Sequence, residues 1–100
     1  MNFSRVNKLI TQANINNCSG FMLKDTKNIQ YFSGYTGEGA AIISENGCAI
    51  ITDSRYTEQA EKQTDGYDII TFEGGKYLDT LQDVCDKLNI DAMCYEADVV

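Results

Sequence analysis

Two short apolar runs, residues 40–44 and 48–52, restrict the possible folds of this chain more than any other feature. Between them stands Asn46-Gly47, a pair that favours the type I′ turn of a tight hairpin because both residues tolerate positive φ. Neither run alternates apolar with polar residues, so each strand is expected to be buried on both faces. The pattern therefore predicts an antiparallel hairpin inside a sheet that helices cover on both sides.

Helices and strands are expected to alternate along the rest of the chain. Apolar spacing predicts helices at residues 3–14, about 54–64 and 76–89, one helical turn at 29–32, and strands at 18–23, 67–72 and 92–95. This alternation indicates an α/β fold with a mainly parallel sheet, in which the hairpin supplies one antiparallel strand. The expected core residues are Val6, Leu9, Ile42, Ile50, Ile51, Ile69, Leu81 and Leu88.

The length of 100 residues and the absence of a proline, repeat or low-complexity linker indicate one domain, residues 1–100. The chain stops just after the last expected strand, and nothing remains to cover one face of that strand. We therefore expect the domain to be truncated.

The net charge of −7, from 15 acidic and 8 basic residues, argues against nucleic acid and anionic membrane surfaces as partners. The chain has no signal peptide and no apolar run of the roughly 18 residues that a membrane helix needs. Cys18, Cys48, Cys85 and Cys94 stand singly in apolar stretches, without a Cys-x-x-Cys pair. The sequence therefore predicts a cytoplasmic protein with four reduced, mostly buried thiols.

Several kinds of chemistry are excluded or disfavoured. The chain has no histidine, which removes Ser-His and Cys-His nucleophile pairs and histidine-containing metal sites. The glycine-rich segment 34–39 lacks the Gly-Lys-Ser/Thr ending of a phosphate-binding loop and precedes a strand, so it is interpreted as a flexible loop. Asp53 and Glu73 each follow a strand, but a nuclease-like metal site needs more converging carboxylates. Asp53 or Ser54 is better explained as the cap of the next helix.

Arg55 is the most informative charged residue. It lies just past the end of a strand, where open α/β sheets bind ligands, and an arginine there can bind a carboxylate through two hydrogen bonds. An ion pair with Asp53 or Glu58 explains it equally well. Both interpretations stay open at this point.

A family resemblance enters with two motifs, NIQYFSGYTG at residues 28–37 and ITDSRYTEQA at residues 51–60. In this order and spacing they resemble the amino-terminal domain of creatinase-type metallopeptidases, which include Xaa-Pro aminopeptidases and prolidases. The opening helix, the strand at Cys18 and the closing Glu96-Ala-Asp also fit. The resemblance implies a three-layer, ribonuclease-H-like fold with a five-stranded mixed sheet whose second strand is antiparallel.

The same resemblance implies that catalysis belongs to a separate carboxyl-terminal domain, which holds two divalent metals (manganese, cobalt or zinc). No residue here matches the catalytic or metal-binding motifs, so none is assigned. What carries over is an accessory role in substrate access and oligomer contacts, with the catalytic domain, a second copy of the chain in a homodimer and a peptide substrate as partners. The substrate-adjacent candidates are Tyr35, Thr36, Glu38, Asp53 and Arg55. The alternative is a free-standing, non-enzymatic ligand-binding or assembly module of the same fold.

Overall fold

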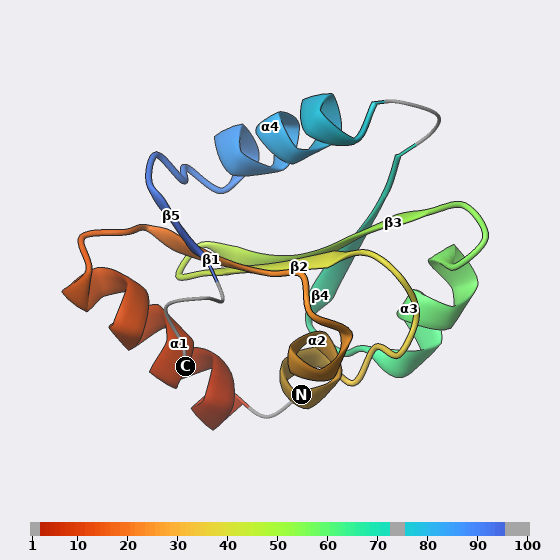
Figure 1. Ribbon diagram of the computed structural model, residues 1–100, viewed down its shortest axis with the longest axis horizontal. Coiled ribbons are helices and arrows are strands. Elements are labelled where there is room, and N and C mark those ends of the chain that lie inside the picture. Colours follow the sequence, from red (N-terminus) through yellow and green to blue (C-terminus); the bar gives the residue numbers. More distant parts are fainter. Residues whose placement is uncertain (1–2, 73–75, 96–100) are drawn as a thin grey trace.

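The computed structural model describes residues 3–72 and 76–95, and Figure 1 shows their arrangement. Its elements follow the predicted order of helices and strands. They are α1 (Phe3–Ile15), β1 (Gly20–Leu23), α2 (Thr26–Ser33), β2 (Ala40–Ser44), β3 (Gly47–Asp53), α3 (Thr57–Gln63), β4 (Tyr67–Phe72), α4 (Tyr77–Lys87) and β5 (Met93–Tyr95). Glu73 and the closing Glu96-Ala-Asp segment, both named above from the sequence, lie outside the described residues.

The strands form one five-stranded sheet in the order β4-β3-β2-β1-β5. β2 runs antiparallel to both β1 and β3, whereas β3 pairs with β4 and β1 with β5 in parallel. The predicted fold class is therefore confirmed, including the antiparallel second strand. β4 and β5 are the two edge strands.

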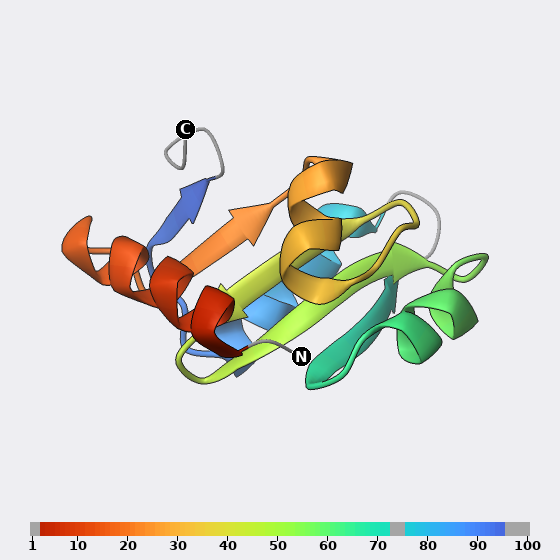
Figure 2. The same ribbon diagram turned by 90° about the horizontal axis from the view of Figure 1, so that it is seen from below.

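Helices cover both faces of the sheet (Figures 1 and 2). One face packs against α1, α2 and α3, through strand residues such as Ile43 and Ile50. Ile42 and Ile51 point to the opposite face, where they pack against α4. Because every residue of β2 is buried, the predicted double-sided burial of this strand is confirmed.

Six of the eight expected core residues are buried, with at most 6% of their surface exposed: Val6, Leu9, Ile42, Ile50, Ile51 and Leu88. The other two, Ile69 and Leu81, are partly buried and pack against the core. Ile69 lies on the edge strand β4, where one side of the strand has no neighbour, which explains its partial exposure.

The hairpin turn differs from the prediction by one residue. Ser44 pairs with Gly47, so the two loop residues are Glu45 and Asn46 rather than Asn46 and Gly47. Gly47 alone takes positive φ, at +147°, and a type I′ turn is therefore excluded. The side chain of Asn46 instead donates a 2.7 Å hydrogen bond to the carbonyl of Leu88, which ties the turn to the end of α4.

The prediction of four reduced thiols is wrong for two of them, because Cys18 and Cys94 are joined by a disulfide. Cys18 precedes β1, and Cys94 lies in β5 beside Phe21 of β1. The parallel pairing of these strands brings the two Cα atoms to 5.9 Å, within the range of disulfides. Cys48 and Cys85 are free, and Cys48 is buried as predicted whereas Cys85 is partly exposed.

Candidate functional site

The candidate residues gather where β2 begins and β3 ends. Ala40 pairs with Ile51, so the glycine-rich loop before β2 and the turn after β3 lie at the same end of the hairpin. We call residues 34–39 together with residues 53–56 the hairpin edge. The antiparallel pairing thus brings the loop and Arg55 to the same end of the β2–β3 hairpin.

Tyr35 lies beneath the loop rather than at its surface, with no exposed area. Its hydroxyl is 2.6 Å from the carbonyl oxygen of Glu38 and 2.9 Å from Oγ1 of Thr52, a buried polar residue of β3. Burial raises the pKa of the Tyr35 hydroxyl above its usual value. The side chain of Tyr35, a predicted substrate-adjacent residue, therefore cannot touch a substrate in this conformation.

The loop closes tightly around Tyr35. A Cβ atom on Gly37 would stand 2.5 Å from the Tyr35 hydroxyl oxygen, so only glycine fits between the loop backbone and the ring. Thr52 Oγ1 also donates to the Glu38 carbonyl oxygen, at 2.7 Å. The glycines that predicted a freely moving loop instead permit close packing. The side chain of Glu38 itself belongs to an exposed residue.

Thr36 joins the loop to α3. Its backbone N–H donates to Oε1 of Gln63 at 2.9 Å, and its Oγ1 accepts from Nε2 of Gln59 at 2.9 Å and from Nε2 of Gln63 at 3.0 Å. Thr36 is one of the residues predicted from the sequence to lie near a substrate, whereas the two glutamines were not predicted. Their i,i+4 spacing, which puts two amides on the same helical face, was the available signal.

Asp53 and Arg55 form an ion pair. The guanidinium Nη2 lies 2.8 Å from Oδ2 of Asp53, and Nε lies 3.3 Å from Oδ1. The hydrogen bond from Arg55 is the main reason that the pKa of Asp53 is lowered, and the same contact raises the pKa of Arg55. Of the two interpretations of Arg55, the structure contains the ion pair with Asp53.

The expected helix cap is absent. Oδ1 of Asp53 accepts from the backbone N–H of Arg55 at 2.9 Å, which closes a side-chain turn before the helix starts. α3 begins only at Thr57, and its N-cap residue, Tyr56, makes no side-chain capping bond. Asp53 thus shapes the turn that presents Arg55 instead of capping α3.

Arg55 is presented to solvent, since 72% of its side chain is exposed. Its guanidinium carbon lies 5.4 Å from the centre of the Tyr56 ring, close enough for a cation–π contact. Asp53 engages Nε and Nη2, so Nη1 stays outside this pair. The arginine is therefore both oriented and accessible, which suits it to an anionic group arriving from outside.

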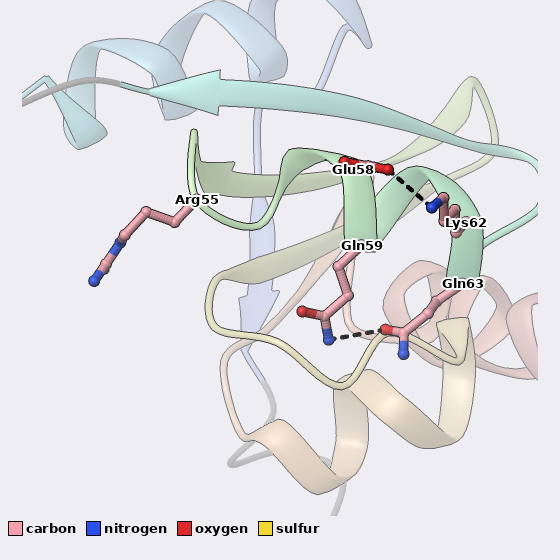
Figure 3. Close-up of a pocket in the computed structure, with 5 residues that line it drawn as sticks. All are labelled: Arg55, Glu58, Gln59, Lys62 and Gln63. Carbon is pink, nitrogen blue, oxygen red and sulfur yellow. Dashed lines mark hydrogen bonds and ion pairs between the residues drawn. The ribbon is translucent and has the colours of Figure 1, made fainter.

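A shallow, open depression lies beside the hairpin edge, lined by Arg55, Glu58, Gln59, Lys62 and Gln63. Lys62 pairs with Glu58 at 2.8 Å on the outer face of α3. Figure 3 shows that Arg55 extends away from these four α3 side chains. The depression offers charged and amide side chains, but no activated nucleophile.

The described residues contain neither a metal-binding cluster nor a membrane-spanning helix. Within residues 3–72 and 76–95, no group of three or more cysteine, aspartate or glutamate side chains lies close enough to hold a metal ion. The described residues thus offer no site for two divalent metals, which the resemblance assigns to a separate carboxyl-terminal domain rather than to this chain. No helix in the same ranges is long and apolar enough to cross a membrane.

Comparison with known proteins points to one family. Residues 5–100 match the family described as the creatinase/prolidase N-terminal domain. The chain is 35% identical over 97 residues to the "Uncharacterized peptidase YqhT" of Bacillus subtilis (strain 168), across 96% of this chain and 26% of that protein. It thus spans about a quarter of the length of that relative.

Solved structures show the same relationship. A Xaa-Pro dipeptidase from Bacillus anthracis matches with a TM-score of 0.87 and 28% identity, over 98% of this chain and 28% of that one. An X-Pro aminopeptidase from Thermotoga maritima MSB8 matches with a TM-score of 0.77 and 32% identity, over 94% and 26%. The N-terminal domain of the cytoplasmic peptidase PepQ from Mycobacterium tuberculosis H37Rv matches with a TM-score of 0.79 and 26% identity, over 97% and 75%.

Proposed function

Because this chain belongs to the creatinase/prolidase N-terminal domain family, we propose that it is the non-catalytic amino-terminal domain of a Xaa-Pro aminopeptidase or dipeptidase. The observation that carries this proposal is the pattern of coverage. Nearly the whole chain matches about a quarter of the Xaa-Pro dipeptidase and X-Pro aminopeptidase chains. The remaining three-quarters of such a protein would hold the hydrolytic centre, with two divalent metals such as manganese, cobalt or zinc.

In this proposal the hairpin edge faces the mouth of the active site and limits which substrates enter it. Arg55 is the residue best placed for this, because it is held by Asp53 and still exposed. Its guanidinium would meet a carboxylate of the peptide substrate. Once water is excluded from the contact, such a charge-assisted hydrogen bond contributes about 1.5–3 kcal/mol. Thr36 and Glu38 shape the loop beside it, and Tyr35 supports that loop from below.

The wider setting is part of the same proposal. The domain would contact the catalytic domain of its own chain and a second subunit in a homodimer, within the cytoplasm. The free-standing module is the less favoured alternative, because the chain aligns with a segment of much longer peptidases.

The test is kinetic and uses the protein encoded by the complete reading frame. Arg55→Ala should lower kcat/KM for Xaa-Pro peptides by about tenfold or more, since the lost contact is worth at least one factor of ten. The melting temperature should change little, because the Arg55–Asp53 pair is exposed. Arg55→Lys, which keeps the charge but loses the planar fork, should recover part of the activity.

Lys87→Ala is the matched control, because Lys87 is a similarly exposed cation, with 66% of its side chain accessible, at the end of α4 on the opposite face of the sheet. We expect it to leave kcat/KM unchanged. Equal kinetics for the wild type and Arg55→Ala would refute the role of Arg55. A fall in melting temperature without a kinetic effect would show that Arg55 is purely structural.

A further inference from the structure

β5 is the least firmly paired strand of the sheet. It lies at one edge and pairs only with β1, through three residue pairs from Gly20–Met93 to Met22–Tyr95. Among the described residues, no strand pairs with the side of β5 that faces away from β1. The chain continues from β5 into residue 96 and beyond.

Two kinds of bond hold β5 on β1. The first are the hydrogen bonds that Ser19 forms with the turn before β5. The backbone N–H of Ser19 donates to the carbonyl of Ala92 at 2.9 Å, and its Oγ lies 2.9 Å from Oδ1 of Asp91. The second is the bond between Cys18 and Cys94, which closes a loop of 76 residues in sequence separation.

The two bonded cysteines differ in accessibility. Cys94 is 4% exposed in the core, whereas Cys18 is only partly buried at the edge of the same cluster. Cys18 is therefore the more exposed half of the disulfide, and Cys94 is held beside it in the core. The other two thiols are poorly suited to compete, since burial raises the pKa of both Cys48 and Cys85 and so disfavours their thiolates.

We propose that Cys18 and Cys94 form a reversible thiol–disulfide couple that fastens the edge strand β5 onto β1. The oxidant is a small-molecule disulfide of the glutathione class. The Cys18 thiolate attacks one of its sulfurs, which forms a mixed disulfide and releases one thiolate. The Cys94 thiolate then attacks the Cys18 sulfur, which closes the protein disulfide and releases the second thiolate. The two protons lost from the cysteines convert the two released thiolates to thiols, so the exchange is balanced.

The consequence is a domain in which the attachment of the edge strand β5 depends on the redox state. In a reducing compartment the couple opens, and β5 is held by its three pairs and by Ser19 alone. In an oxidising one the covalent bond removes conformational freedom from the unfolded chain and fixes β5 on the sheet. This inference does not depend on the proposed peptidase function, because it concerns only contacts within the domain.

The test uses the 100-residue chain equilibrated with either oxidised glutathione or a phosphine reductant. After denaturation, the oxidised protein should show two titratable thiols and the reduced protein four. Peptide mapping of the oxidised protein should recover one cross-linked peptide pair that contains Cys18 and Cys94. Oxidation should raise the melting temperature by on the order of 10 °C. It should also slow hydrogen exchange at the amides of β5.

Two variants separate the couple from general effects of oxidation. Cys48→Ser keeps the couple and should respond to oxidation like the wild type. Cys18→Ser removes the accessible partner and should show no response in melting temperature or in β5 exchange. Four free thiols after oxidation, a different cross-linked pair, or an unchanged melting temperature and β5 exchange in the oxidised wild type would each overturn the proposal.

Discussion

The contact among Tyr35, Thr52 and Glu38 allows a quantitative prediction about how the hairpin edge is held. Three close distances join the Tyr35 hydroxyl, Thr52 Oγ1 and the Glu38 carbonyl oxygen, at 2.6, 2.7 and 2.9 Å. The two hydroxyls carry only one hydrogen each, and a carbonyl carries none. Two of the three contacts are therefore hydrogen bonds at any one time.

The number of hydrogen bonds determines what is lost when either hydroxyl is removed. In Tyr35→Phe, Thr52 still donates to the Glu38 carbonyl, and in Thr52→Val, Tyr35 still does. Each single change therefore removes one hydrogen bond and leaves no partner unsatisfied, at a cost of about 0.5–1.5 kcal/mol in the free energy of unfolding. The double variant also leaves the Glu38 carbonyl without either donor, which adds about 1–3 kcal/mol. The double loss should therefore exceed the sum of the single losses by about 1 kcal/mol or more.

Urea unfolding of the four proteins in this double-mutant cycle measures the excess directly. Tyr67→Phe combined with Thr52→Val is the matched control, because the Tyr67 hydroxyl donates to the carbonyl of Phe32 and shares no partner with Thr52. Those two changes should add within about 0.5 kcal/mol. An excess near zero for Tyr35 and Thr52 would refute the shared carbonyl and the buried position of Tyr35.

Two further predictions concern the core and the buried phenols. Ile50→Ala, at a fully buried residue of β3, should cost about 2–5 kcal/mol of unfolding free energy, whereas Leu78→Ala, at a residue that is 73% exposed, should cost less than about 0.5 kcal/mol. Equal losses in chemical denaturation would contradict the assignment of β3 to the core. Burial raises the pKa of Tyr35, Tyr67 and Tyr77 above 10.0, so the folded state holds protons that the unfolded state loses in alkali. Stability should be intact below about pH 10 and should fall as the pH rises above it, and a urea midpoint that stays constant to about pH 11 would contradict this.

The double-sided burial of residues 40–44 and 48–52 made most of the fold predictable. Consecutive apolar residues cannot all face one side of a sheet, so helices on both faces follow from the local pattern. The order of the elements followed from the same kind of reasoning, because each helix and strand has its own apolar spacing. The shared edge of Arg55 and the glycine-rich loop also follows, since a short hairpin joins the start of one strand to the end of the other.

The features that were not predicted from the sequence depend on contacts between distant residues. Tyr35 stands in a loop of glycines and polar residues, and nothing local shows that Thr52, 17 positions later, supplies a buried partner for its hydroxyl. The Cys18–Cys94 bond spans 76 positions and becomes visible only once β1 and β5 are known to be neighbours. At Asp53, a helix cap and a side-chain turn use the same type of residue, and the sequence does not distinguish them.

The most direct test of the central claim compares two forms of the protein in one assay. The complete reading frame and the 100-residue chain are each supplied with manganese, cobalt or zinc and tested for release of the residue before proline from Xaa-Pro peptides. We predict hydrolysis by the complete protein and none by the 100-residue chain. Hydrolysis by the 100-residue chain alone, or none by the complete protein with any of the three metals, would contradict it.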